Sequence, residues 1–184
     1  KEGIPTYRIM SRNNLIKNHS LKAAVGTYNK SPDPIGNVIN ITNIDSKIPL
    51  TLSTQYSAGY EWLITDLLSL DIQGYYAEQE NIPREISPDE KNTRNGNEIQ
   101  YSTDMKGRMY GLEVLLRHQL GKNFFGWISY TLSRSERKSP NPPAHLYIPD
   151  KQWNSDKWFL FEKDQTHNLQ LIGSWKLPGN WQPG

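Results

Sequence analysis

Apolar and polar residues alternate along several stretches of the chain, most clearly in residues 68–77 and 167–177. In the first stretch the apolar residues fall at even positions, and Ser69, Asp71 and Gln73 fall between them. Side chains of a β-strand alternate with a period of two, so each stretch predicts a strand with one apolar and one polar face. A soluble β-sandwich would bury the apolar face under a second sheet, whereas a transmembrane β-barrel would expose it to lipid.

The pattern predicts seven strands and the start of an eighth. They are residues 6–11, 21–28, 54–64, 68–79, 108–120, 124–134 and 165–177, with the eighth opening at 180–181. Residues 108–120 also carry Leu112, Leu115 and Leu116 at helical spacing. However, the short link at 121–123 leads directly into the strand predicted at 124–134, which is typical of a hairpin. We therefore interpret residues 108–120 as a strand.

Short and long connections alternate between these strands. The short ones are residues 65–67, 121–123 and 178–180, with 12–19 slightly longer. The long ones are residues 29–53, 80–107 and 135–164, each about 25 to 30 residues. Long unstructured loops are uncommon in compact soluble domains, but outer-membrane barrels combine short periplasmic turns with long outside loops. We therefore predict an all-β fold, an antiparallel up-and-down meander that forms part of a large transmembrane barrel.

Large aromatic residues gather beside the predicted short turns. They are Trp62, Phe124, Phe125, Trp127, Trp175 and Trp181. Aromatic rings are enriched at membrane–water interfaces, and barrels carry a girdle of them at each interface. The sequence therefore predicts an aromatic girdle at the short-turn end of the strands.

Composition excludes several functional classes. The 184 residues include no cysteine, which excludes a disulfide framework and a thiolate metal site, and the net charge of +2 does not favour nucleic-acid binding. There is no run of about 18 apolar residues, so a transmembrane helix is not expected. The chain lacks an initiator Met and ends where a strand is predicted to begin. We therefore expect residues 1–184 to be part of a longer protein.

Four segments resemble the barrel of TonB-dependent outer-membrane receptors, and together they cover about two thirds of the chain. They are LKAAVGTYNKSPDP (21–34), QYSAGYEWLITDLLSLDIQGYY (55–76), GRMYGLEVLLRHQLGKNFFGWISYTLSRSER (107–137) and FEKDQTHNLQLIGSWKLPGNW (161–181). The resemblance implies that residues 1–184 are a partial barrel in the outer membrane of a Gram-negative bacterium, with about seven or eight of 22 strands. The sequences of the long loops carry no such resemblance.

The resemblance also implies the partners. These would be outer-membrane lipid, the remaining barrel strands, an N-terminal plug, and the TonB complex, which acts through a TonB box near the N-terminus. The substrate would be a scarce small molecule or glycan, such as a ferric siderophore, cobalamin or a sugar chain. The plug and the TonB box do not occur in residues 1–184. The chain is not expected to be an enzyme, and we predict no catalytic, cofactor-binding or metal-binding residue.

Charged residues on the predicted inner faces of the strands are the first candidate site. They are Lys22, Glu61, Asp71, Glu113, Arg117, Arg134 and Lys176, of which Asp71, Glu113 and Arg117 are the leading candidates. We expect mainly cross-strand ion pairs or contacts with the plug, and a substrate path is the alternative. Glu113 and Arg117 are separated by about 13 Å along a strand, so they are not a helical ion pair.

Two further segments are candidates. The loop at 140–161 carries aromatic side chains suited to binding a sugar or an aromatic chelate, and equally suited to packing on one another: His145, Tyr147, Trp153 and Trp158. Residues 164–167 contain an Asp and a His but no nucleophile motif, so we expect hydrogen bonds that anchor a loop. Two alternatives stay open for the whole chain, a small plug-less barrel and a soluble carbohydrate-binding β-sandwich.

Overall fold

The computed structural model describes residues 4–30, 49–85, 92–94, 97–99, 101–121, 123–141 and 154–177. The strands are β1 (Arg8–Ile16), β2 (His19–Lys30), β3 (Thr51–Leu63), β4 (Leu68–Glu85), β5 (Asn92–Arg94), β6 (Asn97–Ile99), β7 (Tyr101–His118), β8 (Phe124–Lys138), β9 (Phe159–Leu160) and β10 (His167–Trp175). The described residues include no helix long and apolar enough to cross a membrane.

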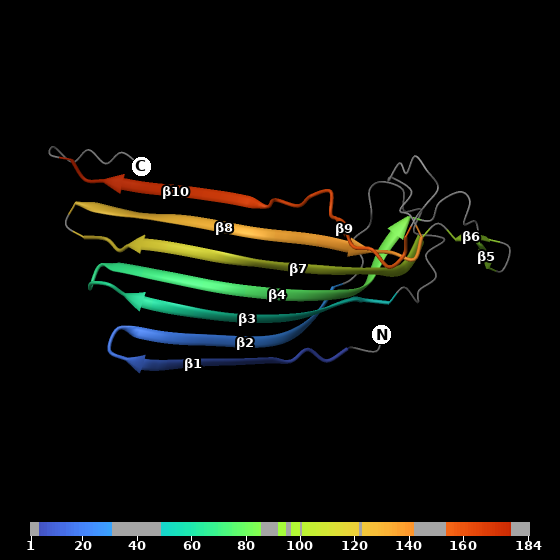
Figure 1. Cartoon of the computed structure of the whole chain (residues 1–184), viewed down its shortest axis with the longest axis horizontal. Coiled ribbons are helices and arrows are strands. Elements are labelled where there is room, and N and C mark those ends of the chain that lie inside the picture. The colour runs from blue at the N-terminus through green and yellow to red at the C-terminus, as the bar shows by residue number, and fades with distance from the viewer. Residues whose placement is uncertain are drawn as a thin grey trace.

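Seven long strands form one antiparallel sheet in the order β1-β2-β3-β4-β7-β8-β10, and the short β9 also pairs with β8. Every long strand therefore lies beside the long strand that precedes or follows it. The tight turns lie together at one end of the sheet, and the strand ends that the long connections join lie at the other (Figure 1). The predicted all-β meander is confirmed. The sheet is open, with β1 and β10 at its edges.

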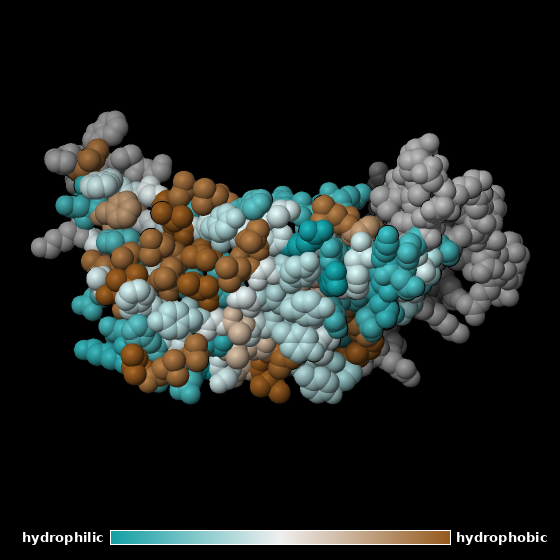
Figure 2. Space-filling view, viewed as in Figure 1, coloured by the Kyte–Doolittle hydropathy of each residue, from teal (hydrophilic) through white to brown (hydrophobic). Residues whose placement is uncertain are grey.

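One face of the sheet, here called the apolar face, carries the even-numbered residues of β4, β7 and β8 and their cross-strand partners. Ile72 lies opposite Val114, and Ile128 lies opposite both Leu116 and Leu171. Ile128 is 46% exposed and Leu171 is 65% exposed. Figure 2 shows the resulting apolar patch, which covers the half of the sheet nearer the tight turns.

The β-sandwich alternative requires this apolar face to be buried under a second sheet. Among the described residues the only other sheet is the β5–β6 pair, which lies beyond the loop end of the long strands (Figure 1). The apolar side chains lie side by side and uncovered, so they form no compact hydrophobic interior. The opposite face, here called the polar face, carries Ser20, Lys22, Gln55, Ser57, Asp71, Gln73, Glu113, Ser129, Asn168 and Gln170.

The strands are longer than the alternating pattern predicts, and one predicted turn is wrong. Residues 12–16 continue β1, and the turn is confined to Lys17 and Asn18, where Asn18 has a φ of 69°. Asn is among the few residues that adopt this left-handed conformation readily. β4 and β7 extend together to Glu85 and Tyr101, with register shifts that interrupt their pairing.

The aromatic girdle forms in part. Trp62, Phe124 and Trp175 lie on the apolar face at the tight-turn end, with Phe124 and Trp175 in contact at 5.2 Å between ring centroids. Phe125 and Trp127 are odd-numbered residues of β8. Because side chains alternate along a strand, they lie on the polar face instead. This part of the prediction is wrong, and Trp181 lies outside the described residues.

A second aromatic row crosses the apolar face nearer the long loops, and the sequence analysis missed it. Tyr56, Tyr76 and Tyr110 lie opposite one another on β3, β4 and β7, and Tyr130 of β8 lies four residues nearer the tight turns, opposite Val114. Six residues separate Trp62 from Tyr56 along β3, and six separate Phe124 from Tyr130 along β8, which is about 20 Å of strand. Two aromatic rows thus border one apolar band, as in outer-membrane barrels.

Candidate functional site

Ion pairs cross the polar face near its tight-turn end. Glu61 and Asp71 lie directly opposite each other on β3 and β4. Glu61 pairs with Arg12 at 2.9 Å, and Asp71 pairs with Lys22. Arg12 reaches Glu61 across β2, and Lys22 reaches Asp71 across β3. Lys22 lies opposite Gly59 of β3, which has no side chain to block this contact. The cross-strand pairing predicted for this wall is therefore present at Asp71.

The other two leading candidates lie on the same face but are not paired. Glu113 and Arg117 are exposed, and neither forms an ion pair with any other residue that the structure describes. Arg117 lies opposite Ser69 and Trp127 near the tight turns, whereas Glu113 lies opposite Gln73 in the middle of the wall. Asp71 lies opposite Leu115, midway between Glu113 and Arg117, so it is a diagonal neighbour of both.

A hollow of about 330 Å³ lies on the polar face around Glu113 and spans β1 to β4 and β7. Small residues form its floor, and they are Ala24, Gly26, Ser57 and Ala77. Polar and aromatic side chains surround them, and they are Arg8, Tyr28, Gln55, Gln73, Tyr75 and Glu113. Phenol, amide and carboxylate groups around a shallow hollow suit a ligand with hydroxyl groups or flat rings. This hollow is the candidate site.

The Tyr75 ring extends from β4 across Gly111 of β7. A Cβ atom at Gly111 would lie 2.8 Å from the Tyr75 hydroxyl group and 2.6 Å from the carbonyl oxygen of Leu132. No side chain fits there without moving the tyrosine or the neighbouring strand. The ring position of Tyr75 therefore depends on a glycine at residue 111.

We expect Gly111→Ala to destabilise the fold by about 1–3 kcal/mol, because the added methyl group overpacks this contact. The measurement is the midpoint of denaturant-induced unfolding of the whole protein. Gly74→Ala is the matched control, because a Cβ atom at Gly74 would meet nothing nearer than 4.0 Å. Equal midpoints for the two variants would contradict the role assigned to Gly111.

Of the four aromatic loop candidates, the structure describes only Trp158. His145, Tyr147 and Trp153 lie outside the described residues. Trp158 packs on Arg108, whose guanidinium carbon lies 4.3 Å from the ring centroid. Arg108 lies on the same side of the sheet as the apolar face, so Trp158 is directed away from the hollow. Ligand binding by the loop residues stays a prediction.

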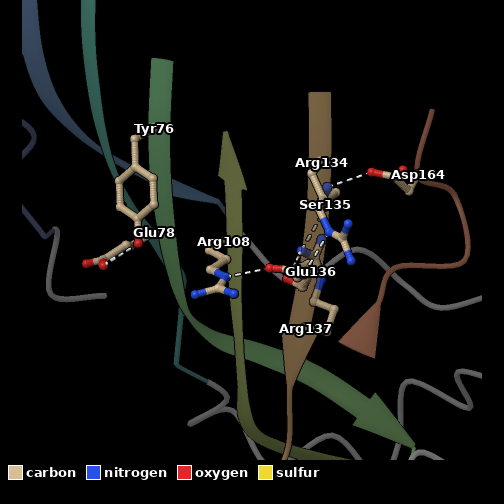
Figure 3. Close-up of polar contacts among 8 residues, drawn as sticks. All are labelled: Tyr76, Glu78, Arg108, Arg134, Ser135, Glu136, Arg137 and Asp164. Carbon is tan, nitrogen blue, oxygen red and sulfur yellow. Dashed lines mark hydrogen bonds and ion pairs between the residues drawn. The ribbon is translucent and has the colours of Figure 1, made fainter. Parts of the chain in front are cut away.

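Residues 164–167 anchor the loop that enters β10. The Asp164 carboxylate accepts a hydrogen bond from the backbone N–H of Ser135 at 2.5 Å (Figure 3). It accepts a second one from the Thr166 hydroxyl group at 2.7 Å. The Ser133 hydroxyl group donates to the carbonyl oxygen of Gln165 at 2.9 Å. The predicted anchoring role is confirmed. No group of three or more His, Asp or Glu side chains in the described ranges could hold a metal ion.

Arg134 lies on the apolar side of the sheet, and its predicted position on the inner wall is wrong. It lies opposite Tyr110, beyond the apolar band, and its Nε–H donates to Glu136 at 2.9 Å (Figure 3). Arg108 donates to the other oxygen of Glu136 at 2.6 Å. The Glu136 side chain is only 7% exposed. Burial alone would raise the pKa of Glu136, but hydrogen bonds from the two arginines hold it below the usual 4.5.

Comparison with known proteins agrees with this fold. No protein-family model matches the chain, and no curated protein sequence matches it. Among solved structures, the chain is similar to the ferric-catecholate import receptor Fiu of E. coli K12 in its closed form. The match covers 94% of this chain with a TM-score of 0.63 and 14% sequence identity. The chain spans 22% of the length of that receptor. At this identity the likeness shows that the chain shares the fold of one section of that receptor.

Proposed function

We propose that the chain is a section of the wall of an outer-membrane transport barrel of the TonB-dependent receptor type, in a Gram-negative bacterium. The observation that supports this most is the uncovered apolar face bordered by two aromatic rows. Lipid would cover that face, and neighbouring strands of the same protein would pair the open edges of β1 and β10. Closure matters because a bilayer offers no water to satisfy unpaired backbone groups.

The polar face would then line the interior of the barrel. Its ion pairs and the hollow around Glu113 would contact a plug or a passing substrate, and the long loops would capture the substrate outside the cell. A ferric siderophore, cobalamin or a glycan is the proposed substrate class, and the import of ferric catecholates by Fiu favours the first of these. The TonB complex would supply energy through parts of the protein outside residues 1–184. The proposed role is transport rather than catalysis.

Spin labels on two adjacent residues of β8 test the proposal. Ile128 lies on the apolar face and Ser129 on the polar face, and the chain has no cysteine that would compete for the label. The measurement compares Ile128→Cys with Ser129→Cys in the whole protein, made otherwise cysteine-free, reconstituted in lipid vesicles. We expect the label at 128 to be relaxed by oxygen, which dissolves in lipid, and the label at 129 by a water-soluble nickel complex.

Other outcomes separate the alternatives. In a soluble β-sandwich, the label at 128 would be shielded from both relaxing agents, and the protein would appear in the soluble fraction of the cell. That result would rule out the proposed function. If the native protein is little longer than 184 residues and oxygen still relaxes the spin label at residue 128, the result would favour the plug-less barrel.

A further inference from the structure

Arg137 is a buried cation with no anionic partner in the described parts of the chain. It is 8% exposed and lies at the loop end of the polar face, opposite Gly107. Its guanidinium group stacks on the Phe161 ring, 4.2 Å from the centroid. Only its Nη1 atom donates, to the Ser135 hydroxyl group at 3.3 Å and to the Glu136 carbonyl oxygen at 3.1 Å.

Three other arginines of this region, Arg84, Arg108 and Arg134, each have a carboxylate partner. Arg84, which is also buried, binds both carboxylate oxygens of Asp104, at 2.7 and 2.9 Å. Arg108 and Arg134 share Glu136 on the other side of the sheet. A buried charge is costly unless an opposite charge and hydrogen bonds compensate it, so buried arginines are almost always paired. Arg137 is the exception.

The free edge of the guanidinium group remains open to a ligand. An arginine has five N–H donors, and the Nε and Nη2 groups of Arg137 have no acceptor among the residues that the structure describes. Neither atom is fully enclosed, since the only fully buried side-chain polar atom without a partner among the described residues is Nδ1 of His118. The Nε and Nη2 groups are therefore the donors left for a ligand.

Arg137 does not line the hollow but lies one cross-strand row beyond its loop end. Gln79, Gly107 and Arg137 form one cross-strand row, and the next row of the same face contains Met109 and Ala77, which line the hollow. A Cβ atom at Gly107 would lie 2.8 Å from Nη1 of Arg137, so the glycine makes room for the guanidinium group. Asp164, whose carboxylate binds the backbone N–H of Ser135, already accepts two hydrogen bonds.

We propose that Arg137 binds an anionic oxygen ligand, a carboxylate, catecholate or phosphate group, just beyond the loop end of the hollow. Phe161 and Ser135 hold the guanidinium group so that its planar edge presents paired N–H donors, the geometry that suits two oxygens of one anion. That the ligand is a transported substrate rests on the proposed function. Anion binding by Arg137 does not, and it is measured on detergent-purified whole protein without any transport step.

Calorimetric titration with defined probes tests the site. The anionic probes are citrate, inorganic phosphate and the ferric complex of catechol, and maltotriose is the neutral probe. We expect at least one anionic probe to bind, and Arg137→Met to weaken it about 10-fold to 100-fold, as expected for charge-assisted hydrogen bonds. Arg137→Lys should weaken it less. Arg134→Met is the matched control, three residues away on the opposite side, and should change the affinity less than two-fold.

A second measurement excludes an internal partner. If the Arg137 charge is uncompensated until a ligand binds, Arg137→Met removes that charge. The melting temperature of the variant without ligand should then equal or exceed that of the wild type. A lower melting temperature together with unchanged anion affinity would show that Arg137 pairs with another part of the same protein, and would overturn the proposal. Failure of all three anions to bind the wild type would also overturn it. Neither result would bear on the spin-label test of membrane insertion.

Discussion

Leu171→Arg is expected to destabilise the whole protein by about 2–4 kcal/mol in lipid vesicles, whereas Gln170→Arg is expected to be nearly neutral. The two residues are neighbours in β10 but lie on opposite faces of the sheet. Leu171 lies between the two aromatic rows, where a charged side chain would enter the hydrocarbon layer. The measurement is reversible unfolding by guanidinium chloride, followed by tryptophan fluorescence and by the gel mobility of unheated samples.

Leu171→Arg is expected to have a much smaller effect on stability if water rather than lipid covers the apolar face. Leu171 is 65% exposed and contacts no second layer among the described residues, so Leu171→Arg at a surface in water would change stability by less than about 0.5 kcal/mol. Equal stability of the two variants would therefore contradict a membrane-spanning sheet. Because the variants differ only in the face that carries the arginine, general effects of added positive charge cancel.

Glu136→Gln is expected to destabilise the protein by about 2–3 kcal/mol, because it leaves Arg108 and Arg134 beside a neutral group. The value is below that of a fully buried pair, since the Arg134 side chain is 55% exposed and regains water. Glu78→Gln is the matched control. Glu78 lies in the same row as Arg108, is exposed, and accepts a hydrogen bond only from Tyr76, at 2.9 Å. We expect this control to lie within about 0.5 kcal/mol of the wild type.

The effect of Glu136→Gln should also depend on pH. Glu136 lies beyond the apolar band, and its pKa in the folded protein is below 4.5. Its stabilising contribution is therefore complete above the pKa of the unfolded chain and is lost as the pH falls through the folded pKa. Unfolding measured at neutral pH and again well below 4.5 should show the difference between wild type and variant shrinking in acid. A difference that is constant over this range would contradict the ion-pair assignment.

The strands were predictable where one face is apolar and the other polar. Residues 80–85 and 101–107 are polar at most positions, so they show no period of two, yet they continue β4 and β7. There the pairing depends on backbone hydrogen bonds, which any residue except proline can donate. The charge of a residue was a poor guide to the face of the sheet on which it lies. Arg134 was predicted on the polar face, yet it lies two residues after Leu132 and on the same side, just beyond the apolar band.

The candidate site was less predictable than the fold. Glu113 was identified, but the hollow around it combines residues of five strands, and their alignment depends on the register of each pairing. The exposed tyrosine row was missed for the same reason. Arg137 was assigned to a long loop, because Glu136 and Lys138 on either side of it hide the continuation of β8 in sequence.

The neighbour-to-neighbour order of the strands has a consequence for how the protein assembles. Because each long strand pairs with the long strand next to it along the chain, every pairing of the long strands joins segments that follow each other in sequence. Folding can advance one hairpin at a time, as each new strand adds to a growing edge. In the proposed barrel, the closing step, which must pair the first and last strands of the whole protein, is then expected to be the slow step of assembly.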